Sequence, residues 1–233
     1  MLNSQLSLAV HLPDDETFDS FFAGDNQQLL DQLLGLADQD LTQATYIWGK
    51  PGSGRSHLLH ACCALLSQKN LATAYLPLRR FDQMSPLVLE GLENVALVCF
   101  DDLDAIAGQP IWEEALFDFY NRRLELDSPA PLVISGSAPV NQLGLQLADL
   151  ESRVNWGLSY KVNELNDAQK VQALQMRADQ RGMKLELDVA KYLLKRLSRD
   201  MKTLISHLDE LDKASIQAQR KLTLPFVKES LSL

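Results

Sequence analysis

The sequence has no long apolar run and few cysteines. No run of about 18 or more apolar residues occurs, and the N-terminus is polar and acidic where an export signal would be basic and then apolar. We therefore expect a cytoplasmic protein with no membrane partner. The three cysteines, Cys62, Cys63 and Cys99, are odd in number and have no metal-ligand spacing with the histidines, which predicts reduced thiols in the core.

Positive charge is also scarce. The chain has 22 Lys and Arg against 31 Asp and Glu, a formal net charge of −9. Because neutralisation of phosphates by Lys and Arg supplies most of the non-specific affinity for nucleic acids, this balance argues against a protein that binds DNA directly. Two basic pairs, Arg79-Arg80 and Arg122-Arg123, leave local contacts open, although solvated surface charges explain them more simply.

What remains is the pattern of an α/β protein. Five short apolar runs predict strands at residues 44–48, 73–78, 95–100, 131–135 and 158–162. The runs are continuous instead of alternating, which is typical of a parallel sheet covered by helices on both faces. Between them lie helical patterns such as 111–126, whose expected buried face includes Ile111 and Leu124.

The strand signal stops near residue 163. Helices are predicted at 167–181, 188–197 and 200–218, with Asp167 and Asp188 as N-caps and Gly182 as a helix stop. We therefore expect an α/β domain at 13–162, preceded by the segment 1–12, and a small helical domain at 163–233.

A glycine-rich turn joins the first predicted strand to the next predicted helix. Residues 48–57 read Trp-Gly-Lys-Pro-Gly-Ser-Gly-Arg-Ser-His, close to the phosphate-binding pattern G-x-x-x-x-G-K-[ST]. Such a turn directs backbone N–H groups at phosphate oxygens, and the helix adds its positive end. Arg55 stands where the pattern has Lys, so nucleotide binding is better supported than turnover. The candidate nucleotide-binding residues are Gly49, Lys50, Pro51, Gly52, Ser53, Gly54, Arg55, Ser56 and His57, with the Ser56 hydroxyl also a ligand for Mg²⁺.

Two carboxylates end the third predicted strand. Asp101 is expected to bind Mg²⁺, and Asp102 to orient an attacking water. The next strand also has a polar end, at which Ser137 is a candidate contact of the nucleotide; a simple Ser-Gly turn explains it equally well. We therefore expect the acidic pair to complete the nucleotide site.

Taken in order, these motifs resemble AAA+ ATPases, and among them the family related to the replication initiator DnaA. The resemblance covers essentially the whole chain. Residues 17–26 resemble the box that surrounds the base, residues 150–158 the arginine-finger box, and residues 200–204 the lid motif that carries a phosphate sensor. The resemblance implies roles in nucleotide binding for Phe18, Phe21, Gly24, Asn26 and Lys202, the last replacing the usual Arg.

The resemblance also implies an AAA+ P-loop fold: a five-stranded parallel sheet between helices, followed by a helical lid. Arg153 would act in trans, completing the ATP site of a neighbour, which is either DnaA or a second copy of the chain. An arginine that caps a helix or pairs with Glu151 is the alternative. With Arg55 and Lys202 altered, we expect weak intrinsic hydrolysis and bound ADP, another nucleoside diphosphate or ATP, with Mg²⁺. The initiator's DNA-binding domain has no counterpart before the sequence ends at Leu233.

A short peptide near the N-terminus points to a further partner. Gln5, Leu6, Ser7 and Leu8 resemble the motif Q-L-x-L that bacterial proteins insert into the sliding clamp, the β subunit of DNA polymerase III. An edge strand with alternating leucines is the alternative. The sequence predicts a negative regulator that docks on the DNA-loaded clamp, reaching DNA only through it, and stimulates hydrolysis of DnaA-bound ATP. A helicase-loader type of ATPase and a purely structural adaptor are the other candidates.

Overall fold

The computed structural model describes residues 15–38 and 43–231, which divide into two compact units. Unit 1 contains the described residues up to Phe18 together with Asn26–Asn163, and unit 2 contains Asp19–Asp25 together with the described residues from Glu164 onward. No helix within the described ranges is long and apolar enough to cross a membrane.

Unit 1 is built on a five-stranded parallel sheet, as predicted. Its strands are β1 (Thr45–Trp48), β2 (Thr73–Pro77), β3 (Leu97–Asp101), β4 (Leu132–Gly136) and β5 (Leu158–Lys161). Their order across the sheet is β2-β3-β4-β1-β5, and every pairing is parallel. The central strands β3 and β4 are buried throughout, whereas the edge strands β2 and β5 are only partly buried. Continuous apolar runs therefore correspond to strands covered on both faces.

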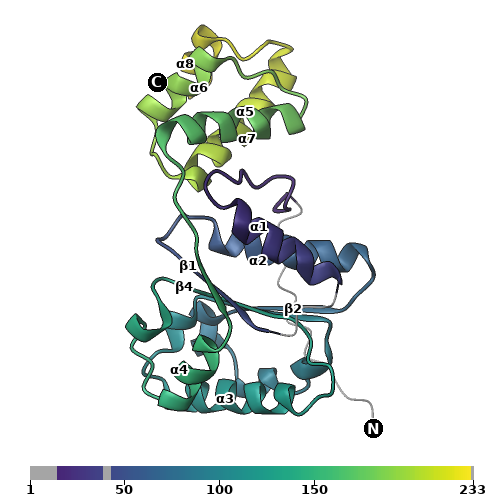
Figure 1. Cartoon of the computed structure of the whole chain (residues 1–233). Coiled ribbons are helices and arrows are strands. Elements are labelled where there is room, and N and C mark those ends of the chain that lie inside the picture. The colour runs from purple at the N-terminus through teal and green to yellow at the C-terminus, as the bar shows by residue number, and fades with distance from the viewer. Residues whose placement is uncertain (1–14, 39–42, 232–233) are drawn as a thin grey trace. The chain divides into compact units, whose positions relative to one another are not determined.

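Helices cover both faces of this sheet. The helices of unit 1 are α1 (Gln27–Leu34), α2 (Arg55–Gln68), α3 (Pro110–Leu124) and α4 (Ala148–Asn155). Figure 1 shows α1 and α2 on one face and α3 with α4 on the other. The cysteines were predicted correctly as core residues, since Cys62 and Cys63 on α2 and Cys99 on β3 are buried and unpaired by disulfides.

The buried face of α3 differs from the predicted one. Ile111 is 72% exposed and Leu124 is 43% exposed, whereas Glu113 and Arg123 are buried. The Glu113 carboxylate accepts hydrogen bonds from the backbone N–H groups of Gly108, Gln146 and Leu147 at 2.7 to 2.8 Å. Buried polar groups are stable when they are hydrogen-bonded in this way, and apolar periodicity alone does not reveal them.

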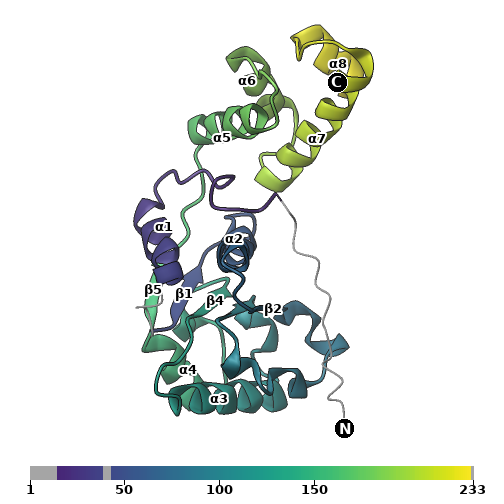
Figure 2. The same ribbon diagram turned by 90° about the vertical axis from the view of Figure 1, so that its right-hand side faces the viewer.

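Unit 2 is helical. It contains α5 (Asp167–Gln180), α6 (Leu187–Arg196), α7 (Met201–Ala218) and α8 (Leu224–Leu231), which are drawn in Figure 2. Their buried side chains form one apolar core. Two predicted N-caps are wrong. Asn166 caps α5 with a capping box, and Glu186 precedes α6, so Asp167 and Asp188 lie inside the first turns. Gly182 ends α5 in the left-handed region, φ 72°, as predicted.

Candidate functional site

The glycine turn lies at the carboxyl end of β1, which runs between β4 and the edge strand β5. Gly52 and Gly54 have φ of 81° and 98°, in the region that side chains disfavour. A Cβ on Gly49 would lie 2.8 Å from the Val162 carbonyl oxygen, so only glycine fits there. Gly54 is the N-cap of α2, and no side chain caps that helix. The first N–H groups of α2 are therefore available to an anion.

Two buried polar atoms of the turn fit a phosphate ligand. Ser53 Oγ and Arg55 Nη1 are buried and have no hydrogen-bond partner within the described part of the chain. Buried polar groups are rarely left unpaired, because losing water without a partner costs roughly 1–3 kcal/mol. An acceptor-rich group such as a phosphate would satisfy both atoms. Lys50 and Pro51 are exposed at the tip of the same turn.

The acidic pair lies at the end of β3, which β4 separates from β1 in the sheet. Asp101 and Asp102 are 4% and 8% exposed. The Asp101 carboxylate accepts hydrogen bonds from the hydroxyls of Ser135 and Tyr75, the latter at 2.7 Å. Asp102 accepts from Arg55 Nη2 at 2.9 Å and from Arg79 Nε at 2.5 Å. The structure thus brings the glycine turn and both carboxylates into one polar cluster.

Three members of that cluster were not among the predicted site residues. Ser135 on β4 bonds Asp101 and also accepts from the backbone N–H of Asp102 at 2.8 Å. Burial and the Asp101 carboxylate raise the pKa of the Tyr75 phenol well above its usual value, so it acts as a donor. Arg79 follows β2. Adjacent parallel strands end at one edge, and polar residues near those ends would have included Ser135 and Arg79 among many candidates, whereas Tyr75 lies in the middle of β2.

Ser137, the predicted contact on this edge, lies in a turn. Its backbone N–H donates to Asp104 Oδ1 at 2.9 Å, and the residue is exposed. This hydrogen bond joins the segment after β4 to the segment after β3.

The residues present fit a magnesium ion held mainly by a bound nucleotide. The described residues contain no group of three or more His, Cys, Asp or Glu that could hold a metal by itself. In phosphate-loop proteins, however, phosphate oxygens and water supply most ligands, and the protein adds a loop hydroxyl and an Asp. Ser56 is exposed at the start of α2, and each carboxylate oxygen of Asp101 has two lone pairs.

The segment before Phe18 is attached to α2 by two histidines. His57, a predicted nucleotide contact, lies with Nε2 2.9 Å from the Thr17 carbonyl oxygen. His60 Nδ1 forms an ion pair with Glu16, and its ring lies edge-on to Tyr75 with centroids 4.4 Å apart. Phe18, which follows this segment, is half-buried.

The Glu16–His60 pair should make stability depend on pH. Burial raises the pKa of Glu16, but the hydrogen bond with His60 and the charges of His57 and His60 outweigh it, so the pKa is lowered. The stabilisation is therefore present above the unfolded-state pKa, about 4.3, and is lost as the pH falls through the lower folded value. We expect Glu16→Gln to cost roughly 1 kcal/mol at pH 7 and progressively less below about pH 4.

Urea unfolding followed by tryptophan fluorescence measures the free energy of unfolding of unit 1, because Trp48, Trp112 and Trp156 all lie in that unit. Glu90→Gln, which removes an exposed carboxylate, is the matched control and should show no such pH dependence. If the two variants had the same free energy of unfolding at every pH from 3 to 7, the prediction would be contradicted.

Asn26 has a structural contact at the exit of the sheet. Its side chain donates to the Asn163 carbonyl at 3.1 Å and accepts from the Asn163 N–H at 2.7 Å. Both ends of the Asn26 amide are thus hydrogen-bonded to the backbone that follows β5. These bonds fix the start of α1 beside that segment.

The remaining predicted contacts from the base-surrounding box and the lid belong to unit 2. Phe21 is half-buried, and Gly24 has φ 51° with Leu165 so close that a Cβ would lie 2.7 Å from it. Lys202 is exposed in the first turn of α7, beside Thr203, whose N–H donates to the N-cap Asp200 at 2.9 Å. Gln5–Leu8, the predicted clamp peptide, lies outside the described residues.

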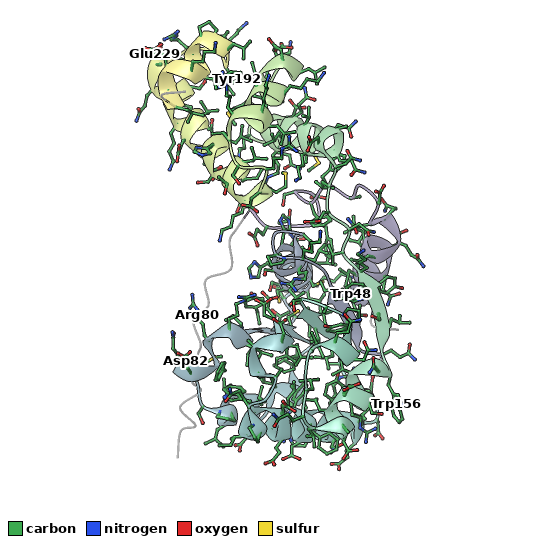
Figure 3. The ribbon with its side chains drawn as sticks, turned by 90° about the vertical axis from the view of Figure 1, so that its left-hand side faces the viewer. Trp48, Arg80, Asp82, Trp156, Tyr192 and Glu229 are labelled. Carbon is green, nitrogen blue, oxygen red and sulfur yellow. The ribbon has the colours of Figure 1, made fainter. Side chains whose placement is uncertain are left out.

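Arg153 lies on α4, which is on the face of the sheet opposite α2 (Figure 1). Its guanidinium donates to Asn121 Oδ1 at 3.2 Å and lies 5.0 Å from the ring of Trp156, which is 70% exposed. Figure 3 shows Trp156 at the surface, well away from Trp48 at the end of β1. Among the described residues no carboxylate lies within ion-pair distance of Arg153, so the predicted alternative of a pair with Glu151 is not observed.

Several solved structures share this fold. Domain III of the replication initiation protein DnaA from Thermotoga maritima is similar over 95% of this chain and 97% of its own, with 21% identity and a TM-score of 0.77. DnaA from Aquifex aeolicus, bound to AMPPCP, is similar over 88% of this chain and 67% of its own, with 20% identity and a TM-score of 0.71. The Thermotoga maritima RuvB Holliday junction branch migration motor is similar over 95% of this chain and 72% of its own, with 14% identity and a TM-score of 0.69.

The C-terminal part of the chain carries a more specific signal. Residues 167–231, which form the helical bundle of unit 2, match the Hda lid domain. The helical unit is therefore similar to the lid of the Hda family, and the whole chain has the DnaA-like AAA+ fold.

Proposed function

We propose that this protein is a cytoplasmic negative regulator of replication initiation, which stimulates hydrolysis of ATP bound to DnaA. It acts while docked on the DNA-loaded sliding clamp and with a bound nucleotide, which is ADP, another nucleoside diphosphate or ATP, together with Mg²⁺. In this role it presents Arg153 to the ATP of DnaA. Contact with DNA is made through the clamp.

The environment of Arg153 is the observation that carries this proposal. A guanidinium held by a neutral amide and an aromatic ring keeps its full charge for an anion, whereas an ion pair would neutralise it. The position of α4, across the sheet from α2, favours action on a neighbouring molecule over action on its own glycine turn. Such an arginine stabilises the charge that develops on a transferring phosphoryl group.

Nucleotide binding by the chain itself is supported by the unpaired Ser53 Oγ and Arg55 Nη1 and by the uncapped start of α2. A protein of the same fold, DnaA from Aquifex aeolicus, is bound to the nucleotide AMPPCP. We also expect weak intrinsic hydrolysis, because Asp102, the predicted orienting group for an attacking water, is paired with two arginines. The helicase-loader alternative, which requires turnover by the isolated protein, therefore has less support.

The decisive experiment measures hydrolysis of DnaA-bound ATP with DNA-loaded clamp, in the presence and absence of this protein. Stimulation that depends on both the clamp and the protein supports the proposal. No stimulation by the wild type, together with steady-state ATP turnover by the isolated chain, would favour a loader-type ATPase.

Docking on the clamp is tested separately. Replacing Gln5 and Leu6 by Ala should weaken binding to the clamp at least 10-fold, because a few anchor side chains supply most of the affinity of short extended peptides. Surface plasmon resonance with immobilised clamp measures this. Asn3→Ala, next to the motif, is the control and should bind normally. Wild-type affinity of the double variant would contradict docking through this peptide.

A further inference from the structure

The guanidinium of Arg55 has one hydrogen-bonded terminal nitrogen, Nη2, and one terminal nitrogen without a partner among the described residues, Nη1. The residue begins α2, directly after the glycine turn, and only 7% of its side chain is exposed. Nη2 donates to Asp102 Oδ1 at 2.9 Å, whereas Nη1 is buried with no partner among the described residues. A planar fork of this kind can bond one group at each end, which a lysine ammonium cannot do with the same rigidity.

Asp102 is held from the other side by Arg79. Arg79 Nε donates to Asp102 Oδ2 at 2.5 Å, and its side chain is 61% exposed. The hydrogen bond and the charge of Asp102 raise the pKa of Arg79, so this guanidinium stays charged. The Asp102 backbone, at φ 58°, is fixed by its N–H bond to Ser135 Oγ. A carboxylate with both oxygens engaged by guanidinium groups is poorly placed to orient a water molecule.

The charges explain why two arginines are needed. If Asp102 paired with Arg55 alone, it would cancel most of the attraction of Arg55 for a phosphate. With Arg79 on its second oxygen, the Asp102 carboxylate is compensated by a second guanidinium and cancels less of the charge of Arg55.

We propose that Asp102 and Arg79 are positioning residues that fix Arg55, so that its free Nη1 binds the phosphates of a nucleoside diphosphate. The inference rests on the proposed nucleotide binding and deepens it. It assigns Asp102 a role in holding the nucleotide where the sequence pattern suggested a role in hydrolysis. It also explains how an arginine serves in a loop that ordinarily has lysine, since the planar fork holds a carboxylate at one end and a phosphate at the other with fixed geometry.

The test measures ADP affinity of the full chain by isothermal titration. Arg79→Ala should raise the Kd for ADP about 5- to 10-fold, because Asp102 then competes with the phosphate for Arg55. In an Arg55→Lys background, the same substitution should change the Kd less than about 2-fold, since the bridge is already lost. Arg79→Lys keeps the charge and should recover part of the affinity.

Arg80→Ala is the matched control. Arg80 is the next residue and is exposed, and Figure 3 shows it projecting from the surface, so this variant loses the same charge without touching Asp102. It should leave the Kd within about 2-fold of the wild type. The melting temperatures of Arg79→Ala and Arg80→Ala should agree, which separates positioning from a loss of fold.

Equal effects of Arg79→Ala in both backgrounds would overturn the inference, because Arg79 would then act independently of Arg55. An unchanged Kd in Arg79→Ala would do the same. If the wild type bound no ADP, the nucleotide-bound part of the proposed function would fail and the inference with it. Coupled effects on ADP affinity in a protein that does not stimulate DnaA would establish the inference and overturn only the regulatory function.

Discussion

Arg153→Ala should abolish the stimulation of DnaA-bound ATP hydrolysis, reducing the stimulated rate by about 10³-fold. An arginine delivered by a partner stabilises the transition-state charge on the transferring phosphoryl group, and alanine offers neither charge nor donors. Arg153→Lys should remain strongly impaired, because lysine provides a point charge without the planar fork. Binding of ADP and of the clamp should be unchanged in both variants, since neither the glycine turn nor Gln5–Leu8 is altered.

The measurement follows DnaA loaded with radiolabelled ATP, mixed with DNA-loaded clamp and each variant. Arg80→Ala, which removes an exposed arginine from the same unit, should stimulate like the wild type. An Arg153→Ala protein that stimulates normally would refute the arginine finger, whatever the nucleotide-binding results. Loss of stimulation accompanied by loss of clamp binding would instead point to a damaged fold.

The sheet and the glycine turn could be predicted because their signals are local. Central strands buried on both faces must be apolar throughout, and this continuous pattern identified β3 and β4 within about two residues at either end. The turn depends on glycine at 49, 52 and 54, where backbone conformation or close approach leaves no space for a side chain. The order strand, turn, helix then placed the phosphate site at the end of β1.

The contacts that define the polar cluster could not be predicted in the same way. Arg55 pairs with Asp102 across 47 positions, and Arg79 reaches the same carboxylate from the segment after β2. Either arginine could be a solvated surface charge as far as the sequence pattern shows. Their meeting depends on the strand order β2-β3-β4-β1-β5, which brings the ends of separate strands together.

Helix α4, which carries Arg153, was absent from the predicted elements although its sequence motif was recognised. The helix has only eight residues, and only Leu150 and Val154 are buried. Short helices are stabilised mainly by tertiary contacts, so their sequences carry weak periodic signals. For α4 those contacts come from α3, through Asn121 at Arg153 and through Glu113 at the start of the helix.

Glu113→Ala should therefore destabilise unit 1 by about 3 kcal/mol, which is a loss of roughly 150-fold in the folding equilibrium. The carboxylate is 1% exposed and accepts three backbone N–H bonds, from Gly108 at one oxygen and from Gln146 and Leu147 at the other. Alanine would leave those donors without their acceptor, although partial access of water to the 146–147 turn would recover some of the loss. Glu113→Gln retains one acceptor oxygen and should have an intermediate effect.

Urea unfolding at pH 7 with tryptophan fluorescence isolates this effect, because all three tryptophans lie in unit 1. Glu114→Ala is the matched control: it removes the same charge from the next position of α3, where the side chain is exposed, and should change stability by less than about 0.5 kcal/mol. Because Glu113 holds the first turn of α4, its alanine variant should also stimulate DnaA less than the wild type does, even at temperatures where unit 1 is still folded. A Glu113→Ala protein as stable as Glu114→Ala would show that the three backbone bonds are replaced by water without loss.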